Sequence, residues 1–162
     1  MKIIPVKILS KAVRTGTATV VGLILGSLTG WIYYGFLLVV NIRKKRISLS
    51  TGLRSFLKRY YPSIIAGNVR IIGNAVGVPP GKIAVTHGNN IFCKESFCEE
   101  KTDDMNLLYH ELVHIDQYKK HREWFFYFLY GYQYLNEGFS YSDMPLEKEA
   151  FDYTRRFKES AG

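Results

Sequence analysis

The amino-acid sequence predicts an α+β domain that follows a single apolar helix. Three observations lead to this prediction: a charge-free run between Arg14 and Arg43, short β-prone segments among turn residues at positions 68–93, and apolar residues at helical spacing after position 102. A chain of 162 residues suits one globular domain rather than two. We therefore divide it into an N-terminal basic segment with a transmembrane anchor, residues 1–46, and a globular domain, residues 47–162.

Charge is distributed unevenly along the chain. Residues 1–94 contain 14 Lys and Arg and no Asp or Glu, whereas residues 95–162 contain 8 basic and 14 acidic residues. The net charge of +8 therefore conceals a basic first part and an acidic second part. A nucleic-acid partner is not expected, because no recognition motif accompanies the basic residues.

Residues 17–41 are predicted to form one membrane-spanning helix, because about 20 apolar residues cross the hydrocarbon core of a bilayer. The apolar run is longer than that of a cleavable signal peptide, and no small-residue cleavage site follows it. The alternative is a buried helix or hairpin of a soluble domain. Basic residues flank both sides of the run and leave the orientation open, although their count slightly favours a cytoplasmic globular domain.

Two further features of this region indicate membrane contacts. Gly22, Gly26 and Gly30 share one helix face, where small residues let two helices approach closely, so this face is a candidate homodimer contact. Residues 43–61 combine basic residues with an apolar stripe, which is typical of a helix on an anionic membrane surface. An ordinary exposed helix is the alternative interpretation of that segment.

Three strands are expected in the first part of the globular domain. The segments 68–72, 82–87 and 91–93 are rich in β-branched and aromatic residues. Glycine and proline separate the first two segments, and Gly88 begins a turn between the last two. These strands would form a short sheet ahead of the helical second part of the domain.

Cys93 and Cys98 are the only cysteines in the chain. Two cysteines are too few for a zinc site built from paired cysteines. They would form a disulfide in an oxidising compartment and stay reduced in the cytosol, so the sequence leaves their state open.

Residues 110–114 read His-Glu-Leu-Val-His and carry the strongest chemical signal in the chain. They lie on an expected helix that begins near Thr102 and has acidic residues in its first turn. His110 and His114 are four residues apart, so both imidazoles project from one helix face and can reach one metal ion at about 2.0–2.1 Å. Glu111 lies beside them, near enough to accept a proton from a water molecule that the metal activates.

A hydrolytic zinc site needs a third protein ligand and an open position for water. His121 lies two turns beyond His114, too far for the same ion, and His87 ends a strand, where a substrate contact is expected instead. Cys93 and Cys98 are possible ligands but lie upstream across a turn-rich stretch, so the favoured candidates are the downstream carboxylates Glu123, Glu137, Glu147 and Glu149. Glu147 shares the apolar face of the last expected helix with Ala150, so it is the predicted ligand, with Glu137 and Glu149 as alternatives.

Three blocks of the sequence resemble the gluzincin-type zinc metallopeptidases, and more closely a group of small bacterial metallopeptidase-like domains. They are residues 84–91, residues 108–117 with the His-Glu-x-x-His pattern, and residues 145–150, which read Pro-Leu-Glu-Lys-Glu-Ala. The resemblance implies a zincin-like fold, in which a short sheet precedes the motif helix and a later helix carries a glutamate. It further implies Zn2+ held by His110, His114 and Glu147, with Glu111 as the catalytic base.

Residues 124–134 are strongly aromatic. A second helix packed on the motif helix is the first interpretation, and a membrane-facing aromatic belt is the alternative. Enzymes of the kind that this chain resembles often use a Tyr or His to stabilise the oxyanion. The candidates for substrate or oxyanion contacts are His87, Tyr132, Tyr141 and Tyr153.

The sequence therefore predicts a single-pass, membrane-anchored zinc metallopeptidase that hydrolyses a peptide or protein substrate. Residues 82–87 are expected to supply an edge strand along which an extended peptide pairs, an expectation that rests on the resemblance and on the strand position. The alternative is a membrane-tethered binding or assembly module that keeps a zincin fold and cleaves nothing. An intact Glu111 favours the enzyme, because a scaffold needs no catalytic base.

Overall fold

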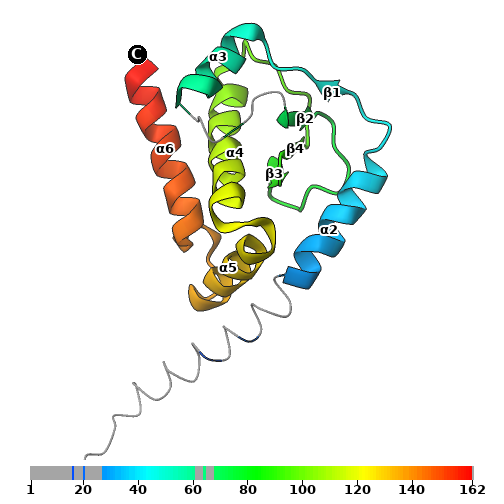
Figure 1. The fold of residues 1–162 in the computed structure, drawn as a ribbon, viewed down its shortest axis with the longest axis vertical. Coiled ribbons are helices and arrows are strands. Elements are labelled where there is room, and N and C mark those ends of the chain that lie inside the picture. The colour runs from blue at the N-terminus through cyan, green and yellow to red at the C-terminus, as the bar shows by residue number, and fades with distance from the viewer. Residues whose placement is uncertain (1–15, 17–19, 21–26, 61–63, 65–67, 162) are drawn as a thin grey trace, which may run out of the picture.

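The computed structural model describes residues 16, 20, 27–60, 64 and 68–161, with side chains as far as residue 156. The helices with described bounds are α2 (Ser27–Val40), α3 (Thr51–Tyr60), α4 (Thr102–His121), α5 (Glu123–Asn136) and α6 (Pro145–Ala161), and η3 (Tyr141–Asp143) is a 3-10 turn. The strands are β1 (Arg46–Ile47), β2 (Arg70–Ile72), β3 (Ala84–His87) and β4 (Asn90–Cys93). The predicted α+β class is confirmed (Figure 1).

The four strands form one mixed sheet in the order β1-β2-β4-β3. β1 and β2 are antiparallel, β2 and β4 are parallel, and β4 and β3 form an antiparallel hairpin. Gly88 lies in the hairpin turn with a φ of +57°, a conformation that glycine adopts at low cost. Among the described strands β3 pairs only with β4, so β3 is an edge strand.

Helices cover both faces of this sheet (Figure 1). On one face, Leu112 of α4 belongs to the main core together with Ile91 of β4. On the other face, Leu37 of α2 forms a second buried cluster with Phe92, the next residue of the same strand. Neighbouring residues of β4 thus serve opposite faces, as the two-residue period of a strand requires. α6 packs on the far side of α4, so the layers run α6, α4, sheet and α2.

The prediction of a membrane-spanning helix over residues 17–41, and with it the single-pass membrane localisation, is wrong. Among the residues that the structure describes, no helix is both long enough and apolar enough to cross a bilayer. α2 has 14 residues, and its inner side covers the sheet, with Leu37 fully buried. Gly22 and Gly26 of the candidate dimer face lie outside the described residues, and Gly30 packs against the ring of Tyr127 in α5.

Polar contacts fix the C-terminal half of α2 to the loop after β2. The side-chain amide of Asn41 donates to the backbone oxygens of Leu37 and Val76, each at 2.9 Å, and its oxygen accepts the N–H of Val76 at 2.8 Å. The hydroxyl of Tyr33 donates to the backbone oxygen of Gly77 at 2.7 Å. α2 is therefore held to the sheet by directed bonds as well as by apolar contacts.

Replacing Leu37 by Ala is expected to lower the free energy of unfolding by about 2–5 kcal/mol, because it leaves a cavity between α2 and the sheet. Val39→Ala is the matched control, since Val39 lies on the same helix but is 70% exposed. Its effect should stay within about 0.5 kcal/mol. Urea unfolding of the full chain without lipid measures both variants. If Leu37→Ala were as stable as the parent, α2 would not belong to the core.

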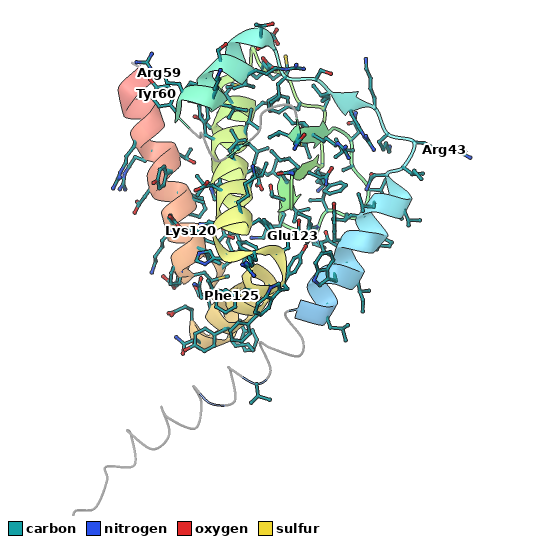
Figure 2. All side chains as sticks on the ribbon, in the orientation of Figure 1. Arg43, Arg59, Tyr60, Lys120, Glu123 and Phe125 are labelled. Carbon is teal, nitrogen blue, oxygen red and sulfur yellow. The ribbon has the colours of Figure 1, made fainter. Side chains whose placement is uncertain are left out.

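Part of the apolar stripe of the basic segment 43–61 lies inside the protein. Within α3, Leu53 and Leu57 are buried in the main core. Figure 2 places Arg43 and Arg59, near the two ends of this segment, on opposite sides of the domain. Packing inside the protein thus accounts for Leu53 and Leu57, whereas Tyr60 at the end of α3 is 51% exposed.

α5 is the aromatic helix expected from residues 124–134, and it packs on the motif helix α4. The ring of Phe126 stacks on that of Tyr118, with 3.8 Å between centroids. On another side of α5, Tyr127 meets the indole of Trp31 edge to face at 5.7 Å. α5 therefore joins α4 to α2.

Cys93 and Cys98 are both free thiols, so the disulfide that the sequence leaves open is not formed. Cys93 is buried in β4, and burial raises the pKa of its thiol to about 12. The thiol of Cys98 donates to the carboxylate of Glu100 at 2.7 Å. Neither sulfur lies in the group of residues described next.

Candidate metal centre

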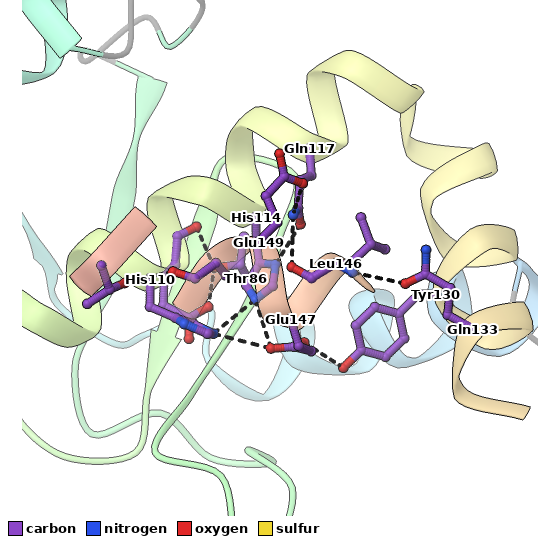
Figure 3. A network of polar contacts seen from close by, with 12 residues as sticks. Thr86, His110, His114, Gln117, Tyr130, Gln133, Leu146, Glu147 and Glu149 are labelled. Atoms are coloured by element: carbon purple, nitrogen blue, oxygen red, sulfur yellow. Dashed lines mark hydrogen bonds and ion pairs between the residues drawn. The ribbon is translucent and has the colours of Figure 1, made fainter. Parts of the chain in front are cut away.

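Two helices supply a buried cluster of two histidines and one glutamate (Figure 3). His110 and His114 lie one turn apart on α4, and Glu147 lies in the first turn of α6, which packs along α4. Their exposed fractions are 8%, 6% and 1%. Among the described residues these three offer nitrogen and oxygen atoms close enough to hold one metal ion.

The separations of the three facing atoms fit a metal ion. The Nε2 atoms of His110 and His114 are 3.2 Å apart, and Oε2 of Glu147 lies 3.3 Å and 3.5 Å from them. Tetrahedral ligands at about 2.0–2.1 Å from zinc would be about 3.3–3.4 Å from each other. Oε2 of Glu147 is buried and, apart from the two imidazoles, has no partner among the described residues. The site therefore suits a metal ion, although the atoms do not single out zinc.

Without a metal, Glu147 favours a proton on His114, and these two residues share it. Burial lowers the pKa of His114, but the hydrogen bond and charge of Glu147 outweigh this effect and raise the pKa to about 9. Burial raises the pKa of Glu147, and the hydrogen bonds from His110 and His114 outweigh it, so that pKa lies well below its usual range. A metal ion bound to these atoms would displace the shared proton.

Gln117 fixes the orientation of His114. Its Oε1 lies 2.8 Å from Nδ1 of His114, and because an amide oxygen only accepts, Nδ1 carries the hydrogen and Nε2 is left to bind metal. Its Nε2 donates to the backbone oxygen of Leu146 at 3.0 Å and to Glu149 at 2.9 Å. Gln117 is 1% exposed and ties the histidine helix to the helix of Glu147 (Figure 3).

Replacing Gln117 by Met is expected to weaken metal binding about 10- to 100-fold, because His114 loses the contact that sets its tautomer. Gln133→Met is the matched control: Gln133 accepts the N–H of the same Leu146 at 3.0 Å and bonds neither histidine. Competition with a chromophoric chelator measures the zinc affinity of each. Equal affinity losses in the two variants would show that Gln117 acts only on the packing of α6.

Glu111 is held at the centre by the edge strand. It is 5% exposed, and its Oε2 accepts the hydroxyl of Thr86 at 2.7 Å. Thr86 lies in β3, and its own backbone oxygen accepts a hydrogen bond from the hydroxyl of Tyr118 at 3.2 Å. The carboxylate thus has one oxygen fixed and the other available for a water molecule.

A pocket of about 430 Å³ lies beside the centre. Both Glu111 and Glu147 line it, so it reaches the catalytic candidate and the metal-site candidate together. Its other walls come from α2, β3, α5 and η3 and are mostly aromatic or apolar, including Tyr33, Val85 and Phe126. α2, which the sequence assigns to a membrane, therefore forms part of the wall of this pocket.

His87 and Tyr141, two of the candidate substrate contacts, line the pocket. His87 is 5% exposed, its Nδ1 lies 2.9 Å from the hydroxyl of Tyr127, and burial lowers its pKa to about 4. His87 is therefore a neutral imidazole. Burial and the charge of Glu147 raise the pKa of Tyr141 well above its usual range, which keeps its hydroxyl protonated as a donor.

The other two tyrosine candidates do not line the pocket. Tyr153 is 42% exposed, and its ring packs under the guanidinium of Arg156 at 5.9 Å. Tyr132 packs on the ring of Phe128 within α5. Tyr130, which the sequence does not single out, lies closer to the centre: its hydroxyl donates to Oε1 of Glu147 at 3.1 Å.

The alternative glutamates occupy other positions. Glu149 accepts a hydrogen bond from Gln117, and Glu137 accepts one from Asn136 at the end of α5. Glu123 begins α5 and lies against Gly88 of the hairpin turn. None of the three is in the group that could hold a metal among the described residues.

Comparison with protein families connects part of this site to a known domain. Residues 78–122 match the family model described as the eCIS core domain. The matched segment contains β3, β4 and α4 with both histidines and Glu111, and it ends before Glu147. No curated protein and no solved structure matches the chain. The match covers the histidine helix and the edge strand, and a peptidase activity is not part of its description.

Proposed function

We propose that this chain is a zinc-dependent metallopeptidase of the gluzincin type, with a zincin-like fold. The observation that carries the proposal is the convergence of His110, His114 and Glu147 beside Glu111, on a pocket bordered by the edge strand β3. Two histidines and a glutamate form a ligand set of catalytic zinc sites, which keep a fourth position for water or substrate.

Each residue of the centre has a part in the proposed reaction. Zinc bound there would polarise a peptide carbonyl and make a water molecule a stronger acid. Glu111, held by Thr86, accepts the proton of the attacking water and delivers it to the leaving amine. Tyr141, a protonated hydroxyl on the pocket wall, is the proposed donor to the oxyanion.

The free edge of β3 supports binding of an extended peptide beside the centre. The N–H of Lys94 donates to the backbone oxygen of Ile83, so Ile83 faces β4 and the next residue, Ala84, presents its backbone groups to the free edge. The backbone oxygen of Thr86 is already bonded to Tyr118. An added peptide strand would therefore pair at Ala84, ahead of the residue that holds Glu111.

The proposal is tested on the purified full chain by metal analysis and by mass spectrometry of a digested peptide library. We expect about one equivalent of zinc, cleavage of peptides, loss of cleavage with a strong chelator and recovery on adding Zn2+. A folded, zinc-loaded protein that binds peptides without cleaving them would contradict the enzyme and favour a binding or assembly module with the same fold.

A further inference from the structure

Lys82 is a basic residue on an otherwise apolar and acidic pocket wall. Among the described residues that line the pocket, no other is a Lys or Arg. Lys82 lies two residues ahead of β3, is half-buried, and its ammonium packs over the ring of Tyr141. Within the described parts of the chain, no carboxylate lies within ion-pair distance of this ammonium.

The position of Lys82 is costly without an anionic partner. Burial lowers the pKa of its ammonium, while the more distant charges of Glu147 and Glu111 act in the opposite direction. A cation that has lost part of its water shell needs hydrogen-bond acceptors in return, and an aromatic ring replaces only part of them. A ligand with a negative group would complete the surroundings of the ammonium.

The charge of the pocket depends on the metal. Without a metal, the negative charges of Glu111 and Glu147 are balanced by Lys82 and by the proton on His114, which also lines the pocket. With a divalent ion at the histidines and Glu147, the positive charges exceed the negative ones by one. The metal-loaded pocket therefore attracts a negatively charged ligand, and Lys82 is the protein side chain placed to receive it.

We propose that Lys82 binds a carboxylate of the substrate in this pocket, either the C-terminal carboxylate of a peptide or the side chain of an Asp or Glu. The inference rests on the proposed peptidase function, because it names the substrate class of the same site. The aromatic residues of the pocket would contact the neighbouring apolar side chain of that substrate. A C-terminal carboxylate would make the enzyme a carboxypeptidase, and an acidic side chain would make it an endopeptidase.

Binding is measured on the full-length, zinc-loaded Glu111→Gln variant, so that no peptide is consumed. Acetylated hexapeptides of Ala and Phe serve as probes of three kinds: one with a free C-terminus, its C-terminal amide, and the six amides in which a single residue is replaced by Glu. We expect the free acid or one Glu peptide to bind about 10- to 100-fold more tightly than the neutral amide. Adding Lys82→Met should remove this difference.

Lys94→Met is the matched control, because Lys94 is an exposed lysine that follows β4, bonds through its N–H to Ile83 next to Lys82, and does not line the pocket. It should keep the preference for the carboxylate. Lys82→Gln, checked for folding by circular dichroism, serves if the Met variant does not fold. Equal binding of all probes, binding of none, or a preference that survives loss of Lys82 would overturn the inference. Failure of the proposed function is a separate result: the wild-type chain would cleave no peptide, whatever the binding shows.

Discussion

Replacing Glu111 by Gln is expected to reduce peptide hydrolysis by at least about 10²- to 10⁴-fold while zinc remains bound. Gln has nearly the shape of Glu and still accepts the hydroxyl of Thr86, but its amide cannot accept the proton of the attacking water. The effect should fall on kcat rather than on KM, because the lost interaction belongs to the chemical step. Zinc content and kcat/KM are measured on the same preparations.

Glu137→Gln is the matched control for this substitution, because Glu137 lies at the end of α5, outside the group that could hold the metal. It should leave both zinc content and kcat/KM unchanged. Unchanged turnover in Glu111→Gln would remove the general base from the mechanism, and loss of zinc in that variant would show that Glu111 supports the metal rather than the water.

Replacing Glu147 by Ala is expected to abolish stoichiometric zinc binding at micromolar free metal. The substitution removes the Oε2 atom that lies 3.3 Å and 3.5 Å from the two imidazoles, which leaves two protein ligands where catalytic sites use three. The loss of zinc affinity should exceed the roughly 10- to 100-fold loss that is typical when a residue supporting a ligand, such as Gln117, is removed. Competition with a chelator of known affinity gives the ratio.

Glu149→Ala and Glu137→Ala are the controls for the metal ligand. Glu149 lies two residues after Glu147 on α6 and accepts a hydrogen bond from Gln117. Glu149→Ala should therefore weaken zinc binding only through the loss of that hydrogen bond. Glu137 should have no effect. Retention of one zinc by Glu147→Ala, together with its loss in either control, would assign the third ligand to another glutamate.

The sequence reveals those parts of the centre that short-range spacing determines. A separation of four residues places His110 and His114 on one helix face in any α-helix, so their proximity follows from the sequence alone. Placing Glu147 required one further assumption, that the apolar face of its helix packs on the motif helix. The structure does pack α6 on α4 and brings Glu147 to the two histidines. The α+β class follows from the same local patterns, since strands and helices here carry distinct periods.

The misreading of α2 has a physical cause. Ile32 and Val39 are exposed on its outer side while Leu37 is fully buried, so the helix is apolar on both sides. A helix of that kind has the same composition as a membrane helix, and periodicity cannot separate the two. What distinguishes it is a polar anchor such as Asn41, whose partner at Val76 lies 35 residues away in sequence.

Thr86 and Lys82 could not be assigned a role from sequence for a related reason. The contact of Thr86 with Glu111 spans 25 residues, and it exists only because β3 lies at the edge of the sheet beside α4. Lys82 meets Tyr141 across a still longer stretch of chain. Such pairs depend on the order of strands in the sheet, which no local pattern encodes.

The packing of α2 sets an order of events during synthesis of the chain. Leu37 leaves the ribosome well before its partner Phe92, and Gly30 long before Tyr127. At bacterial or eukaryotic elongation rates of about 5–20 residues per second, α2 waits roughly 5–20 s before α5 is available. Its inner face stays open to water until β4 is made, and the side around Gly30 until α5 is made, so association with other nascent chains competes with folding during this interval. The burial of α2 therefore depends on segments made much later than the helix itself, first on β4 and then on α5.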